Sequence, residues 1–197
     1  MASTSILIIT VLVTLLAWNK PSLQQQAMLV PYRTFREQRW YQLVSSGFLH
    51  GDFMHLLFNM ITFLFFGPVL EQVIGTPLFV ILYLTAIVIA NLPTLFKHRN
   101  NPQYASLGAS GAVGAVLFAY ILFFPLSNLY IMFIPIGIPA IIVGVLFVIY
   151  SYSESRKNRG NINHDAHFAG AVYGLIFTLV FVPESLQTFL KALGLIS

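Results

Sequence analysis

Long apolar runs constrain this chain more than any other feature of its sequence. A helix that crosses a membrane needs about 20 mostly apolar residues, within a range of about 17–25. Six segments approach this length, at residues 2–18, 53–74, 77–96, 109–124, 129–152 and 165–183. Proline and glycine lie in the gaps between them, as expected at helix ends. The sequence therefore predicts an all-α integral membrane protein, with six spans in a single membrane domain over residues 1–197.

The composition excludes several other classes of protein. Charged residues make up 8% of the chain, whereas soluble domains carry roughly 25%. The formal charge is +4 and the basic residues form no tract, so we expect no nucleic-acid partner. The chain has no cysteine, which excludes disulfides, a thiolate nucleophile and cysteine-bound metal. We expect a multi-pass protein of a cell (plasma) membrane, and the sequence does not indicate its oligomeric state.

The fourth span is short and begins at a serine. From Ser110 to Phe124 it has 15 residues, or about 22 Å at about 1.5 Å per residue, which is less than the roughly 30 Å of the hydrocarbon core. If Pro125 marks one membrane face, Ser110 lies below the other face and the preceding loop must dip inward. Irregular backbone is tolerated at depth only where it is buried in protein or lines water. The sequence therefore predicts a polar chamber with a buried serine at a helix N-terminus.

Two other spans supply polar groups that could act with Ser110. Histidine is the usual base for a serine nucleophile near neutral pH, and His167 begins the sixth span as Ser110 begins the fourth. These two spans enter from the same side in a six-span chain, so the side chains can lie at similar depth. His55 and Asn59 share one face of the second span and offer an imidazole and an amide donor. The free N–H groups at the start of the fourth span suit an oxyanion.

Each of these residues also has an ordinary structural interpretation. A serine at a helix start is more often a cap or a small packing residue than a nucleophile, and a single histidine more often fills a core. The glycines of residues 108–114, with Gly170 and Gly174, are typical of closely packed membrane helices. Close packing of the fourth and sixth spans would also bring His167 to Ser110. The packing and catalytic interpretations therefore agree.

A metal site and a transporter find little support in the sequence. No HExxH motif is present, which argues against a membrane metalloprotease. Asp52 and Asp165 lie at span edges, so the chain has no pair of intramembrane aspartates. His164 and His167, near Asp165, could bind a metal, but three adjacent ligands on one helical turn are weak evidence. The absence of an internal repeat of the spans argues against a small transporter.

Three motifs together resemble those of the rhomboid family of intramembrane serine proteases. They are G-x-S-G at 108-GASG-111, H-x4-H-x3-N at 50-HGDFMHLLFN-59, and A-H-x-x-G-x-x-x-G at 166-AHFAGAVYG-174. A single G-x-S-G is a weak signal, but the three motifs on the expected spans are specific, and the resemblance covers nearly the whole chain. It implies a Ser–His dyad without cofactor or metal, acting in the lipid bilayer on transmembrane protein substrates, which are cleaved in or near their spans.

The resemblance also assigns roles to individual residues. Ser110 would be the nucleophile and His167 the general base. The oxyanion hole would consist of His55, Asn59 and the Ser110 backbone N–H. The supporting residues would be Gly108, Gly111, His50, Gly170 and Gly174. The fifth span would form the gate for the substrate helix, with 134-IPIGIP-139 as a place where it kinks.

Three features depart from the family pattern. The family's first long loop usually carries Trp-Arg or Trp-Gln before the second-span motif, whereas the aligned pair here is Tyr41-Gln42. Many members place an aromatic residue four positions after the serine, where it stacks on the histidine, but this chain has Gly114. Nine of the ten basic residues lie in the first long loop and in the loops after the third and fifth spans. The positive-inside rule places these loops in the cytoplasm, whereas the resemblance implies the outside.

The alternative function is an inactive rhomboid-like protein that binds and escorts membrane proteins. Gly114 favours this alternative, while the presence of both Ser110 and His167 argues against it.

Overall fold

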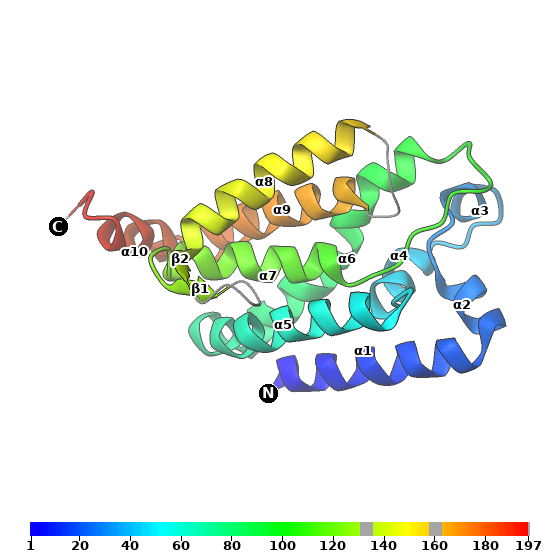
Figure 1. The fold of residues 1–197 in the computed structure, drawn as a ribbon, viewed down its shortest axis with the longest axis horizontal. Coiled ribbons are helices and arrows are strands. Elements are labelled where there is room, and N and C mark those ends of the chain that lie inside the picture. The colour runs from blue at the N-terminus through cyan, green and yellow to red at the C-terminus, as the bar shows by residue number, and fades with distance from the viewer. Residues whose placement is uncertain (131–135, 158–162, 197) are drawn as a thin grey trace.

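Helices make up most of the structure, a computed structural model that describes residues 1–130, 136–157 and 163–196 (Figure 1). The long elements are α1 (Ala2–Asn19), α5 (Phe53–Ile74), α6 (Thr76–Lys97), α7 (Ser110–Phe123), α8 (Ala140–Lys157) and α9 (His164–Phe181). The connection between α1 and α5 contains four short elements. They are α2 (Pro21–Ala27), α3 (Pro31–Arg36), α4 (Gln42–Ser45) and the 3-10 helix η1 (Ser46–Phe48). The helix α10 (Glu184–Ala192) follows α9.

The predicted all-α membrane fold class is confirmed. Within the described residues, α1, α5, α6 and α9 are long and apolar enough to cross a membrane, and α7 is a shorter apolar helix. A helix is present in each of the six predicted segments. That all six cross the membrane stays a prediction.

The short helix α7 runs through the middle of the bundle. It contacts α5, α6, α8 and α9 (Figure 1), and 11 of its 14 residues are buried. At about 1.5 Å per residue it is only about 21 Å long. It therefore begins well inside the bundle, and its first residue, Ser110, is partly buried rather than fully buried.

Glycines set the short distance between α7 and α9. Gly170 lies against the backbone of Gly111, and Gly174 lies against that of Ala115. A Cβ on either α9 glycine would collide with the facing carbonyl oxygen of α7. On its other side α7 lies against α6, where a Cβ on Gly111 would be 2.5 Å from the Cβ of Ala90. Small residues allow this approach, which brings the first turns of α7 and α9 together.

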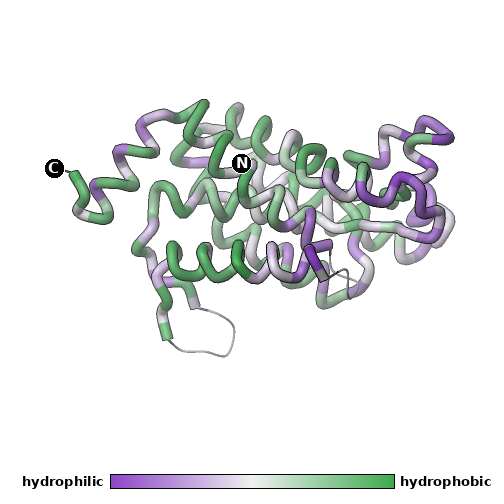
Figure 2. Tube along the Cα trace, turned by 90° about the horizontal axis from the view of Figure 1, so that it is seen from above, coloured by the Kyte–Doolittle hydropathy of each residue, from purple (hydrophilic) through white to green (hydrophobic). Residues whose placement is uncertain are grey.

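One end of the bundle is hydrophilic. The helices α2, α3 and α4 and the loop between α6 and α7 gather at the end from which α7 and α9 start (Figure 1). Colouring by hydropathy shows polar residues concentrated at this end (Figure 2). The two aromatic residues Trp40 and Tyr41 lie here and are about half exposed, at 47% and 53%, as expected for residues at a membrane interface.

A carboxylate from α5 caps the N-terminus of α1. Glu71 accepts the backbone N–H groups of Ala2 and Ser3, at 2.7 and 2.9 Å. It also accepts the hydroxyl groups of Ser3, at 2.6 Å, and Thr76, at 2.8 Å. The first N–H groups of a helix are unpaired and carry a partial positive charge. These four hydrogen bonds compensate for the loss of water around the buried carboxylate. They also hold α1 against the turn between α5 and α6.

The prediction of a helical fifth span from residue 129 is wrong. Two short strands, β1 (Asn128–Tyr130) and β2 (Gly137–Pro139), form an antiparallel pair with Asn128 opposite Pro139. Helix α8 begins only at Ala140. Proline has no N–H and a fixed φ, so Pro139 suits a strand end directly before a helix better than a helix interior. Of the predicted kink at 134–139, residues 134 and 135 lie outside the described residues, and the rest are not helical.

Candidate active site

Ser110 and His167 are joined by a hydrogen bond at the start of two neighbouring helices. Ser110 is the first residue of α7, and His167 lies in the first turn of α9. The serine Oγ and the histidine Nε2 are 2.7 Å apart, although the residues are 57 positions apart in the chain. With Nε2 unprotonated, the serine hydroxyl donates to the imidazole. This is the geometry that a general base needs to take the serine proton.

Gly108 lets the backbone pass close to both His55 and Ser110. Its φ of +133° lies in the region that favours glycine, and its N–H donates to the carbonyl of Ser46 at 3.0 Å. A Cβ on Gly108 would lie 2.8 Å from His55 Nε2 and 3.8 Å from Ser110 Oγ. A side chain at position 108 would therefore collide with the His55 ring, so the glycine allows the imidazole to lie near the serine hydroxyl.

His55 and Asn59 lie on the same face of α5 and line the cleft that contains Ser110. The amide Nδ2 of Asn59 donates to the backbone carbonyl of His55 at 2.9 Å, which uses one of its two N–H bonds. The backbone N–H of His55 donates to Asp52, the N-cap of α5, at 2.9 Å. The start of α5 is thus ordered where it faces the serine.

His50 fixes the backbone directly before Ser110. Its Nε2 accepts the N–H of Ala109 at 3.5 Å, and its Nδ1 lies 3.1 Å from the hydroxyl of Thr14 on α1. Because a backbone N–H can only donate, the ring proton lies on Nδ1 and is donated to Thr14. Burial and the nearby His55 lower the pKa of His50 to about 3, against an opposing effect of Asp52, so the ring is neutral at pH 7. His50 thus ties the start of α7 to α1.

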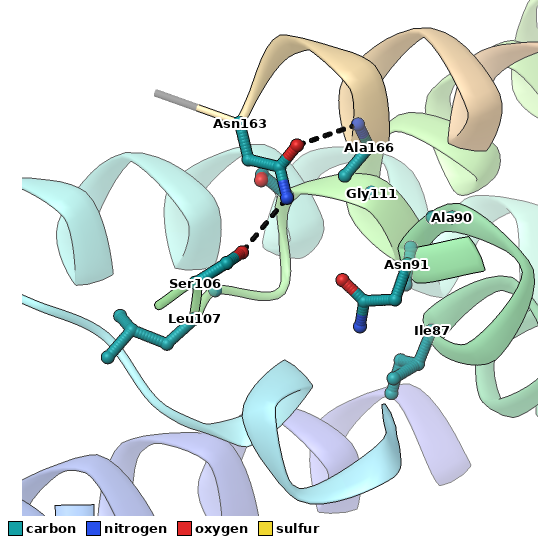
Figure 3. A pocket seen from close by; sticks show the side chains of 11 residues that line it. Ile87, Ala90, Asn91, Ser106, Leu107, Gly111, Asn163 and Ala166 are labelled. Carbon is teal, nitrogen blue, oxygen red and sulfur yellow. Dashed lines mark hydrogen bonds between the residues drawn. The ribbon is translucent and has the colours of Figure 1, made fainter. Parts of the chain in front are cut away.

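Two backbone hydrogen bonds and one asparagine hold the loop between α6 and α7, which leads to Ser110. Leu29 and Ser106 exchange two backbone hydrogen bonds of 2.9 Å each. Asn163, the N-cap of α9, accepts the N–H of Ala166 at 3.1 Å and donates to the Ser106 hydroxyl at 2.9 Å (Figure 3). It also accepts the hydroxyl of Thr94 on α6 at 2.8 Å. The loop before the serine and the start of α9 are therefore anchored to each other. Sequence reasoning did not select Asn163, although an asparagine before a helix is a recognised cap signal.

A small cavity and a wide cleft meet at Ser110. The cavity, with a volume of about 10 Å³, has room for about one water molecule, and Asn91, Ser106 and Asn163 are among its lining residues (Figure 3). The cleft has a volume of about 1110 Å³, and its lining includes His55, Asn59, Tyr104, His164 and His167. These spaces lie where the sequence predicts the polar chamber.

An aromatic ring lies beside His167 and comes from α8 rather than from α7. A Cβ at Gly114 would meet only backbone atoms of α9, at 3.8 and 3.9 Å. The ring of Phe147 lies 5.9 Å from the imidazole of His167, with the planes at 29°. The ring of His164 approaches the same imidazole edge-on at 5.7 Å and 82°. Sequence reasoning missed Phe147 because an aromatic residue in an apolar span resembles any residue that faces lipid.

The structure brings no set of metal ligands together in its described part. Among those residues, no three His, Cys, Asp or Glu side chains are placed to hold one ion. Asp165, considered as a ligand beside His164 and His167, instead forms a salt bridge with Lys97 of α6 at 2.7 Å.

Comparison with known proteins identifies the family. A family model of the rhomboid domain matches residues 37–184. The chain belongs to the rhomboid family.

RHOMBOID-like protein 12 of Arabidopsis thaliana is 28% identical over 163 residues, which cover 75% of this chain and 48% of that protein. The YdcA rhomboid of Bacillus subtilis is 30% identical over 145 residues, covering 74% of this chain and 69% of YdcA. The rhomboid protease GluP of the same organism is 27% identical over 135 residues, covering 68% of this chain and 25% of GluP. This rhomboid chain therefore spans less than half the length of RHOMBOID-like protein 12 and a quarter of GluP.

The prediction of a cell (plasma) membrane is wrong. RHOMBOID-like protein 12 and several other similar proteins are named as mitochondrial. The relatives whose names state a location are thus mitochondrial proteins, not plasma-membrane proteins. The apolar helices of the described residues support the multi-pass character of the rhomboid chain.

Proposed function

We propose that this rhomboid-family protein is an intramembrane serine endopeptidase that cleaves transmembrane proteins in or near their spans. The observation that carries the proposal is the 2.7 Å hydrogen bond between Ser110 Oγ and His167 Nε2, at the start of α7 in a polar cleft. The family includes proteins named as proteases, such as GluP, which supports the reaction class. The dyad alone provides a nucleophile and a base, so the reaction as proposed needs no cofactor.

The first half of the reaction forms an acyl-enzyme. Ser110 Oγ attacks the carbonyl carbon of the scissile peptide bond while His167 Nε2 takes the serine proton. The carbonyl electron pair moves onto its oxygen. That oxygen is stabilised by two donors, His55 Nε2, which lies close to Gly108, and the backbone N–H at the start of α7 on Ser110. Asn59 has a second amide N–H available for the same purpose. His167 then gives its proton to the leaving amine as the C–N bond breaks.

Water completes the cycle. A water molecule attacks the acyl carbon, and His167 takes a proton from it as it took the serine proton before. The bond to Ser110 breaks, and the proton returns from His167 to the serine oxygen. The polar cleft and the small cavity next to Ser110 provide room for this water within the bundle.

Labelling with a fluorophosphonate tests the nucleophile without a known substrate. We expect wild-type protein purified in detergent to be labelled, and Ser110→Ala and His167→Ala to remain unlabelled. Ser155→Ala is the matched control, because Ser155 lines the same cleft and its hydroxyl donates to the backbone carbonyl of Tyr152. This variant should be labelled like wild type. A folded wild type that takes no label would contradict the proposal and support the alternative of an inactive protein that escorts membrane proteins.

A further inference from the structure

The imidazole of His167 has few groups to hold its orientation. Within the described part of the chain, its ring makes one hydrogen bond, to Ser110. A ring held at one nitrogen can still pivot about its bond to Cβ, so contacts on its faces must limit that rotation. Gly114, the α7 residue next to the α9 backbone at this level, has no side chain to supply such a contact.

Phe147 of α8 reaches this ring because α8 approaches α7 closely. One turn before it, a Cβ on Gly144 would lie 2.8 Å from Ile121 Cδ1 and 3.4 Å from Phe118 Cε1, both on α7. The Phe147 ring then packs between α7 and α9, 5.9 Å from the ring of Phe118 and 5.9 Å from the imidazole of His167. Its plane is inclined by only 29° to the imidazole, so it faces one side of that ring.

We propose that Phe147 is a positioning residue, which keeps the His167 imidazole in the rotamer that bonds Ser110. This inference rests on the proposed function, because it assigns Phe147 to the base of the dyad. It places the support for the base on α8, a helix separate from both α7 and α9. A displacement of α8 away from α9 would therefore weaken the base without any change in Ser110 or His167.

The test separates the rate of the chemical step from binding of the probe. For Phe147→Leu we expect the maximal rate constant of fluorophosphonate labelling to fall about three- to tenfold, as expected from the loss of one aromatic pair. The probe concentration at half-maximal rate should not change, because Phe147 acts through His167. Phe147→Tyr keeps the ring and should restore the rate. An unfolding temperature measured for each variant identifies any general loss of stability.

Phe168→Leu is the matched control for this test. It removes another aromatic contact between α8 and α9, in which the rings of Tyr152 and Phe168 are 5.6 Å apart at 49°. Its labelling rate should stay at the wild-type value. A normal rate in Phe147→Leu, or an equal loss in Phe168→Leu, would overturn the inference while wild type is still labelled. Wild type that takes no label would instead refute the proposed function, and this inference with it.

Discussion

A methyl group added at Gly170 would meet the backbone of α7 rather than a movable side chain. Its Cβ would lie 2.9 Å from the Cα of Gly111, and closer still to that residue's carbonyl oxygen, whereas carbon atoms in contact normally stay about 3.5–4.0 Å apart. Because the carbonyl oxygen is the nearer atom, helix α9 must move away from α7 by about 1 Å or more. His167 lies one turn before Gly170 on α9, so its Nε2 would leave its hydrogen bond to Ser110.

We therefore expect Gly170→Ala to slow fluorophosphonate labelling about 100-fold, since a misplacement of about 1 Å can cost this much in rate. Overpacking at the helix contact should also lower the free energy of unfolding by about 1–3 kcal/mol. The two quantities are measured as the labelling rate constant and as thermal unfolding in detergent.

Gly114→Ala is the matched control in the same helix pair. A Cβ at Gly114 would meet its nearest atoms at 3.8 and 3.9 Å, which is ordinary contact. The labelling rate should be unchanged, and stability should rise by up to about 1 kcal/mol because alanine favours a helix over glycine. If Gly170→Ala kept wild-type rate and stability, the argument that glycine packing positions His167 would be refuted.

Four further variants, one of them a control, test other parts of the site and the fold. Asn59→Ala should slow labelling by about 10²–10³-fold, the usual cost of one oxyanion donor, and a wild-type rate would remove Asn59 from the site. Glu71→Ala should lower the free energy of unfolding by about 1–3 kcal/mol, because the cap of α1 is lost. Glu184→Ala, which changes an exposed residue of α10, should have little effect, and equal losses in the two variants would contradict the capping role. Folded His50 stays neutral down to about pH 3, whereas in the unfolded chain it takes up a proton near pH 6.5. Its contribution to stability is therefore complete above about pH 6.5 and declines as the pH falls towards 3. His50→Gln should lose less stability than wild type between pH 7 and pH 5, and equal losses in thermal unfolding would contradict this account.

Local patterns were sufficient to predict most of the helices and the meeting of Ser110 with His167. An apolar run of membrane length indicates a helix without knowledge of its neighbours. The glycines of α7 and α9 indicated that these two helices pack closely. The six-span order then placed both helix starts on one side.

Contacts between distant segments could not be found in this way. Nothing near Glu71 in the sequence shows that its carboxylate caps a helix that begins 69 positions earlier. Phe147 is one apolar residue among many until α8 is placed beside α9. The sequence at residues 128–139, which includes both strands, is as apolar as a span, and only its glycine and prolines distinguish it from one. The helix α10 was missed because residues 184–192 mix polar and apolar side chains over a short length.

Mapping the fluorophosphonate adduct by mass spectrometry shows whether His167 activates Ser110 as the nucleophile. The purified protein is labelled, digested and compared with His167→Ala treated in the same way. We expect one adduct, on the Oγ of Ser110, in wild type and none in His167→Ala. An adduct on another serine, or equal modification of Ser110 without His167, would contradict a serine nucleophile activated by this histidine.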